Sequence, residues 1–179
     1  PIELARMRAA IKLTCDAFAE IRAKLGELKT ESEVEAEFTY RFHRAGAKHA
    51  YEPIVASGAN ACTLHYLANK DKLRSRDMVL IDIGARVGGY SADITRTYCL
   101  NPTKRQTAVH AALDKAHQDS IALIAPGLPI AEYIDTVDAI MKQALQDLGL
   151  LDDVSDQETY RKYFPHAISH GLGIDTHDS

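Results

Sequence analysis

The stretch MVLIDIGARVGGYSADITRTYCL, residues 78–100, decides the fold of this chain of 179 residues. β-Branched and apolar residues fill its two halves, 78–87 and 89–100, which is typical of β-strands. Glycines lie between the halves, and glycine accepts the positive φ angles that a tight turn needs. The stretch therefore predicts an antiparallel hairpin with a core-forming first strand.

Each predicted strand of this hairpin holds one aspartate, Asp82 in the first and Asp93 in the second. A two-residue loop at Val87 and Gly88 would place the two aspartates directly opposite each other. On one face of an antiparallel pair, such residues have Cβ atoms about 5 Å apart. Thr95 would share this face, where its hydroxyl could hydrogen-bond a carboxylate.

Two like charges that face each other in an apolar hairpin destabilise it unless something compensates, and a divalent cation is the natural compensation. Carboxylates suit Mn²⁺, Mg²⁺ or Ca²⁺, whereas carboxylates joined by an imidazole suit Mn²⁺, Co²⁺, Zn²⁺ or Fe²⁺. A structural alternative stays open, in which one aspartate caps the hairpin and the other pairs with Arg86 or Arg96.

The sequence around the hairpin predicts helices and one more strand. Apolar residues recur at steps of three and four over residues 2–28, which indicates a long amphipathic helix that ends near Gly26. Thr30 and Glu33 have the spacing of a capping box and begin a second helix, which Gly46 closes. Further segments are expected as a strand at 53–58, helices at 104–124 and 129–148, and a short apolar segment at 164–173. This order, ααβββααβ, favours an α+β fold.

Four of the eight histidines stand beside glycines or small residues: His65, His166, His170 and His177. His65 follows the small-residue loop SGANAC, residues 57–62, and can lean over the hairpin. Imidazoles beside carboxylates complete a metal ligand set, and those that bind no metal can transfer protons. The proline before His166 and the glycines after His170 argue against a helical HxxxH pair. A plain surface position is an open alternative for His177.

Composition excludes several classes of protein. The formal net charge of −4 argues against a nucleic-acid partner. No apolar run approaches the roughly 20 residues of a membrane span, so we expect no membrane association and a cytoplasmic location. Three widely spaced cysteines without a CxxC motif indicate neither a disulfide framework nor a thiolate zinc site.

Three segments carry a family resemblance: SGANACTLHY (57–66), LIDIGARVGGYSADITRTY (80–98) and FPHAISHGLGIDTHD (164–178). In this order and spacing they resemble the metallopeptidases of the pita-bread fold, and specifically the Xaa-Pro aminopeptidases and Xaa-Pro dipeptidases (prolidases). The resemblance implies a truncated pita-bread (creatinase/aminopeptidase-like) fold. Residues 1–179 would form a catalytic domain that is incomplete at its C-terminal end, without the usual N-terminal domain, as part of a longer chain.

The resemblance also implies a role for each site residue. Asp82 resembles a ligand to one metal of a pair, Asp93 the ligand that bridges both metals, and His170 the single histidine ligand. The other three histidines resemble catalytic residues: His65 and His177 those that stabilise the tetrahedral intermediate, and His166 one that marks the proline-directed members. The family's two remaining ligands are glutamates that would come after residue 179. We therefore expect the chain alone to be inactive and to bind metal weakly or not at all.

The implied function is hydrolysis of the peptide bond between an N-terminal residue and proline. Two divalent ions would activate the attacking water, with Mn²⁺ expected first and Co²⁺, Zn²⁺ or Fe²⁺ as alternatives. The expected partner is a peptide with proline at its second position, and a homodimer is left open. Alternatives are a methionine aminopeptidase, a creatinase-type hydrolase, or a non-catalytic pita-bread binding module.

Overall fold

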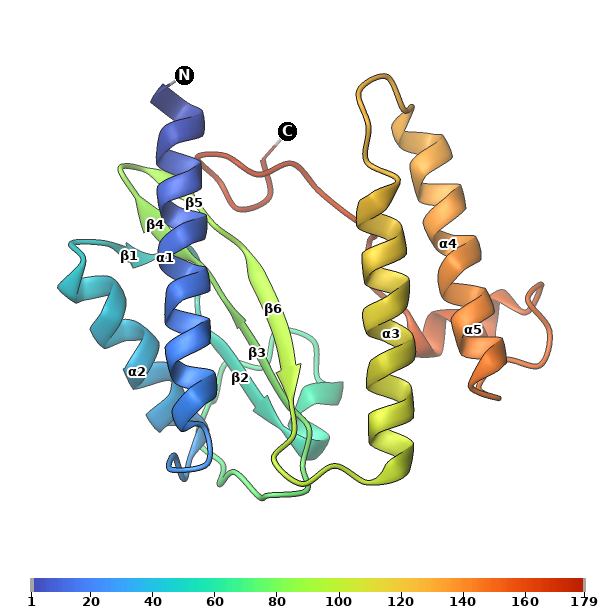
Figure 1. Ribbon diagram of the computed structural model, residues 1–179, viewed down its shortest axis with the longest axis horizontal. Helices are drawn as coiled ribbons and strands as arrows, with labels where there is room; N and C mark the ends of the chain where they lie inside the picture. Colours follow the sequence, from blue (N-terminus) through green and yellow to red (C-terminus); the bar gives the residue numbers. More distant parts are fainter. Residues whose placement is uncertain (1, 179) are drawn as a thin grey trace. The chain divides into compact units, whose positions relative to one another are not determined.

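The computed structural model describes residues 2–178, which divide into two compact units (Figure 1). Within this range the first unit comprises residues 2–102 and 170–178, and the second comprises residues 103–169. The prediction of one catalytic domain over residues 1–179 includes two terminal residues that lie outside the described part, and it stays a prediction. Among residues 2–178, no helix combines the length and the apolar character that a membrane span requires.

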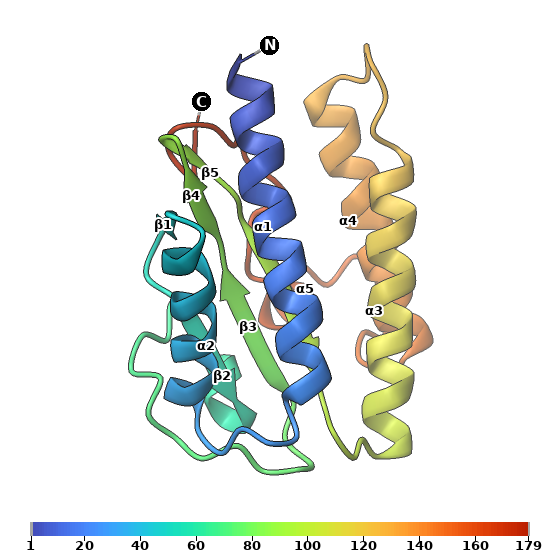
Figure 2. The ribbon, with the colours of Figure 1, turned by 60° about the vertical axis from the view of Figure 1, so that its left-hand side comes forward.

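Two helices of the first unit, α1 (Ile2–Lys24) and α2 (Glu31–Arg44), run side by side and contact one face of its strands (Figure 2). The predicted start of α2 is confirmed. The Thr30 side chain accepts a hydrogen bond of 3.2 Å from the Glu33 N–H, which satisfies one of the free donors of the helix N-terminus. The Glu33 carboxylate in turn accepts from the N–H of Lys29 at 2.6 Å.

The described part of the first unit contains six short strands in two antiparallel sheets, of order β2-β3-β6 and β1-β4-β5. Their bounds are β1 (Lys48–His49), β2 (Ile54–Ser57), β3 (Val79–Ile83), β4 (Ala85–Val87), β5 (Tyr90–Ser91) and β6 (Ile94–Tyr98). A short 3-10 helix, η1 (Gly58–Cys62), follows β2. The two long strands predicted for the hairpin are therefore each interrupted, the first at Gly84 and the second at residues 92–93.

The hairpin turn differs from the predicted one by one residue. Val87 pairs with Tyr90, so the two-residue loop is Gly88–Gly89 and not Val87–Gly88. Both glycines have positive φ, +57° and +90°. The hairpin turn that fits the strand twist needs positive φ at both central positions, which a β-branched valine resists and two glycines accept.

This turn moves every cross-strand pair of the hairpin by two residues. Asp82 pairs with Thr95, so the prediction that it lies directly opposite Asp93 is wrong. A shift of two residues preserves the face to which a side chain points, because side chains alternate with a period of two. Asp82 and Asp93 therefore still share one face of the hairpin, as predicted.

The core of the first unit lies between the two helices and the strands. Phe38 of α2 is fully buried and packs edge-on against Phe18 of α1, with ring centroids 4.8 Å apart. Along β3, Ile81 and Ile83 are fully buried in this core. Alternation along the strand turns Asp82 toward the opposite face, away from α1 and α2.

The second unit contains three described helices, α3 (Lys104–Ala122), α4 (Ile130–Asp147) and α5 (Gln157–Tyr163). The first two confirm the helices predicted at 104–124 and 129–148. The third was missed because its stretch is polar, and it is held by Tyr160, which is fully buried and donates its hydroxyl to Asp138 at 2.5 Å. The apolar segment 164–173 forms no strand, so the last β in the predicted order is wrong.

Candidate metal centre

The two predicted aspartates meet at a tyrosine that the sequence analysis did not single out. The hydroxyl oxygen of Tyr51 lies 2.5 Å from Oδ1 of Asp82 and 3.0 Å from Oδ1 of Asp93. Tyr51 precedes β2 in a connecting segment without periodicity, so no sequence signal marked it. Its phenol holds the carboxylates of two different strand segments at one point.

A glycine makes this meeting possible. A Cβ atom at Gly84 would lie 1.7 Å from the carbonyl oxygen of Ala92 and 3.0 Å from Cε1 of the Tyr51 ring. The backbone before Asp93 and the Tyr51 ring therefore both approach β3 through the space that a side chain would fill. The approach is fixed by a hydrogen bond of 2.9 Å from the Ala92 N–H to the carbonyl of Ala85.

Burial raises the pKa of the Asp82 carboxyl above its ordinary value, and the negative charge of Asp93 raises it further. Hydrogen bonds from Tyr51 and Thr95 act in the opposite direction. Burial together with the charge of Asp82 also raises the pKa of the Tyr51 hydroxyl, which therefore stays a proton donor. A cation placed here would stabilise the ionised carboxylates that burial disfavours.

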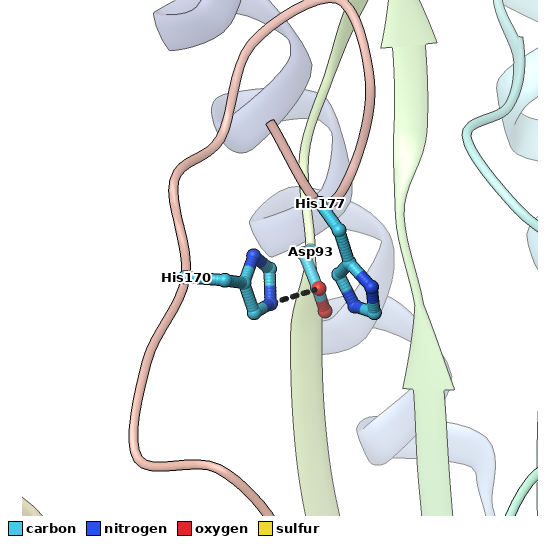
Figure 3. A group of neighbouring side chains, drawn as sticks. All are labelled: Asp93, His170 and His177. Atoms are coloured by element: carbon cyan, nitrogen blue, oxygen red, sulfur yellow. Dashed lines mark ion pairs between the residues drawn. The ribbon is translucent and has the colours of Figure 1, made fainter. Parts of the chain in front are cut away.

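Two histidines of the C-terminal segment, His170 and His177, flank the Asp93 carboxylate (Figure 3). His170 Nε2 is 3.3 Å from Asp93 Oδ2, and the rings of His170 and His177 lie edge to face with centroids 4.2 Å apart. One ligand atom from each of Asp93, His170 and His177 lies within 4.8 Å of the other two. This distance allows one divalent ion to contact all three side chains after small rotations.

The segment that carries these histidines is a closed loop pinned to the hairpin. Asp178 donates its N–H to the carbonyl of Gly171 at 3.0 Å, which brings the ends of the loop together. Ser91 of β5 donates its N–H to the carbonyl of Gly173 at 2.8 Å, and Arg86 of β4 donates to the carbonyl of Ile174 at 3.1 Å. Two histidines seven positions apart in sequence therefore become neighbours.

The donor chemistry of this group fits a metal ion. Nδ1 of His170 lies 2.8 Å from the carbonyl oxygen of Gly171, and a carbonyl can only accept, so Nδ1 carries the proton. In the neutral ring Nε2 then presents a lone pair toward the carboxylate of Asp93. Two acceptors face each other, an arrangement that a proton or a cation between them stabilises. A ligating histidine that donates its other N–H to a carbonyl is a recurring feature of metal sites.

The structure brings together some of the predicted site residues. Asp82 and Asp93 share Tyr51, and His170 and His177 lie beside Asp93. His65 is exposed in the loop after η1, where a positive charge on its ring would lower the pKa of Asp82. His166 lies in the second unit, exposed in the loop that follows α5, and its role stays a prediction.

Mixed α and β elements, with carboxylates and imidazoles on one face of a hairpin, define an α+β fold with a candidate metal-binding site. The model of metallopeptidase family M24 matches residues 5–179, and the chain belongs to this family. Its predicted family and pita-bread fold class are confirmed by this match and by the solved structures below.

The chain is similar to curated and solved Xaa-Pro aminopeptidases. It is 37% identical to the Escherichia coli enzyme, covering 99% of this chain and 42% of the relative. It is 34% identical to human Xaa-Pro aminopeptidase 3, covering 100% and 36%. Zinc-substituted Escherichia coli aminopeptidase P in complex with product superimposes with a TM-score of 0.86 over 99% of this chain and 42% of that one, at 37% identity. Saccharomyces cerevisiae Icp55 gives 0.90 over 99% and 46%, at 34% identity. The chain thus spans less than half the length of these relatives.

Proposed function

We propose that the protein to which this chain contributes is an Xaa-Pro aminopeptidase that hydrolyses the bond between an N-terminal residue and proline. The observation that carries the proposal is the convergence of Asp82, Asp93 and His170 in a chain of family M24. The relatives named Xaa-Pro aminopeptidase support the proline-directed reaction. An Xaa-Pro dipeptidase is the narrower alternative for the same chemistry.

The residues that would hold divalent ions in this proposal are Asp82, Asp93 and His170, with Asp93 assigned as the ligand common to both ions. Divalent ions held there would supply an activated water and polarise the substrate carbonyl. Mn²⁺ is the first ion to test, followed by Co²⁺, Zn²⁺ and Fe²⁺, because carboxylates with an imidazole suit all four.

Other residues of the site would position groups or donate protons. The Tyr51 hydroxyl orients both carboxylates through its contacts at 2.5 and 3.0 Å. His177, packed on His170, and His65 are assigned to donate hydrogen bonds to the substrate oxygen as negative charge develops there. His166 is assigned as the catalytic histidine that marks the proline-directed members of the family. A proline after the scissile bond has no N–H, so a pocket can select it by shape and by the missing donor.

The test is peptide cleavage by the full-length protein that carries this sequence. We expect Mn²⁺- or Co²⁺-dependent release of the first residue from an Xaa-Pro-initiated peptide, with an Xaa-Pro dipeptide measured in parallel. Cleavage of a Met-initiated peptide instead would replace the assignment by a methionine aminopeptidase. If the Asp93→Ala variant keeps both its bound metal and its activity, the ligand assignment is contradicted. Metal binding without any cleavage would favour a non-catalytic module.

A further inference from the structure

A fully buried carboxylate lies beneath the loop that holds His65. Glu31, the first residue of α2, has no exposed surface. Its Oε1 accepts hydrogen bonds from the Ser57 N–H at 2.8 Å and the Asn60 side-chain amide at 3.0 Å. Its Oε2 accepts from the Tyr66 hydroxyl and from the Asp71 N–H, both at 2.9 Å. One side chain therefore joins η1 and both ends of the loop to α2.

The four contacts explain how a carboxylate is tolerated in this position. Burial of an unpaired carboxylate is strongly unfavourable, but two donors at each oxygen replace the lost water. The location at the N-terminus of α2 adds the favourable field of the helix dipole. Because every partner of Glu31 is a donor, a neutral amide in its place would turn its own N–H₂ group toward two of them.

A second carboxylate of α2 holds the same loop one helical turn further on. Glu35 accepts a hydrogen bond of 2.9 Å from the side-chain amide of Asn69. Asn69 is itself buried, and its amide also joins the carbonyl of Pro53 and the N–H of Val55, each at 2.9 Å. Glu31 and Glu35 are four residues apart and therefore lie on one face of α2.

The segment between these anchors is not held by burial of its own side chains. Leu64 and Leu67, on either side of His65, are 57% and 54% exposed. His65 has a φ of +52° and Asn69 a φ of +42°, a left-handed conformation that residues with side chains seldom adopt. Such a conformation persists only where the surroundings impose it, and the contacts next to His65 are those of Tyr66 with Glu31.

We infer that Glu31, assisted by Glu35, is a positioning residue of the metal centre: from within α2 it fixes the loop of residues 58–71 and so sets the place of the His65 imidazole. The consequence for catalysis rests on the proposed function, because there His65 acts on the substrate. The anchoring itself rests on the contacts alone, and it can be measured without substrate.

The first experiment measures amide hydrogen exchange and histidine ring resonances in the full-length protein. Glu31→Gln keeps the size of the side chain, and we expect exchange over residues 57–71 to accelerate about tenfold or more and the His65 resonance to shift or broaden. Glu27→Gln changes an exposed carboxylate before α2 and should alter neither. If Glu31→Gln proves poorly folded, Tyr66→Phe removes one of the four donors to Glu31, together with the Asn60–Tyr66 hydrogen bond, and should give a smaller change in the same direction. Unchanged exchange and an unchanged His65 signal would overturn the inference.

The second experiment is a double-mutant cycle on the cleavage of an Xaa-Pro peptide. We expect Glu31→Gln to lower kcat about tenfold with little change in KM, and to lower it no further in a His65→Ala background. If the losses in kcat of the two single variants multiply in the double variant, Glu31 does not act through His65. This result would overturn the inference even if amide hydrogen exchange accelerates in Glu31→Gln. If the unaltered protein cleaves no peptide, the proposed function fails, and the exchange and histidine measurements still decide the anchoring.

Discussion

Replacement of Gly84 by alanine is expected to destabilise the first unit although it adds only a methyl group. The new Cβ would lie 1.7 Å from the carbonyl oxygen of Ala92, whereas real Cβ contacts essentially never fall below 3.0 Å. The backbone must therefore separate by at least the difference, 1.3 Å. The obstacle is a main-chain atom, so side-chain rotation cannot relieve it.

The free energy of this separation follows from the contacts that it breaks. The Ala92 N–H donates to Ala85 at 2.9 Å and the Ala50 N–H donates to Gly84 at 2.8 Å. A buried donor left without a partner costs about 1–3 kcal/mol, and the smaller entropy of the unfolded alanine chain returns about 0.4–1 kcal/mol. With both donors affected, we expect a net loss of about 1–6 kcal/mol in the free energy of unfolding.

Urea denaturation followed by circular dichroism measures this loss, with Gly26→Ala as the matched control. A Cβ at Gly26 would meet only the two methyl groups of Leu100, at 3.8 and 4.0 Å, which are ordinary contacts, so this variant should stay within about 0.5 kcal/mol of the parent. If Gly84→Ala is as stable as Gly26→Ala, the Ala92 backbone does not approach Gly84 as closely as described above. The same displacement would move Asp93, so Gly84→Ala should also weaken Mn²⁺ binding in the full-length protein.

Three further predictions concern the polar groups. Tyr51→Phe removes the donor shared by two carboxylates and should weaken Mn²⁺ binding about 10- to 100-fold by calorimetric titration, and unaltered affinity would exclude an orienting role. Burial raises the pKa of Asp82, so just above the ordinary pKa of 3.8 the metal-free folded state binds more protons than the unfolded state, and stability falls as the pH rises through that window. Asp82→Asn should therefore raise the Tm of the metal-free protein at pH 7, and a lowered Tm would contradict this. Burial lowers the pKa of His49, so its contribution to stability is complete above the ordinary pKa of 6.5 and is lost as the pH falls below it; His49→Gln should flatten the decrease in stability between pH 7 and 5, and a steeper decrease would reverse the sign.

The sequence predicted those elements whose signals are local. The capping contact of Thr30 and Glu33 depends on residues three apart, and the helices follow from apolar periodicity. Asp82 and Asp93 share a face because side chains alternate along a strand with a period of two. An error of one residue in the turn moves each cross-strand pair by two residues, so the predicted face stayed correct. Choosing the turn required the stereochemistry of two adjacent glycines, which a count of strand residues does not include.

Contacts between distant segments could not be read from the sequence. Tyr51 reaches the aspartates because Gly84 leaves room for its ring, and neither residue marks this relation locally. His177 joins His170 because the loop closes through main-chain hydrogen bonds. The helix α5 is polar along its length and depends on one buried tyrosine, so periodicity did not reveal it.

The return of the loop 170–178 to β5 also bears on the order of folding. Asp93 and His170 are 77 positions apart, and the whole second unit lies between them in the chain. Closing a loop of that length costs on the order of 4 kcal/mol of chain entropy, whereas the hairpin closes across two glycines. The hairpin with Asp82 and Asp93 is thus able to form early, and the histidine loop docks afterwards. A metal ion that contacts Asp93 and His170 would then stabilise the docked loop, which forms in the last folding step. Removal of the metal should release this loop first.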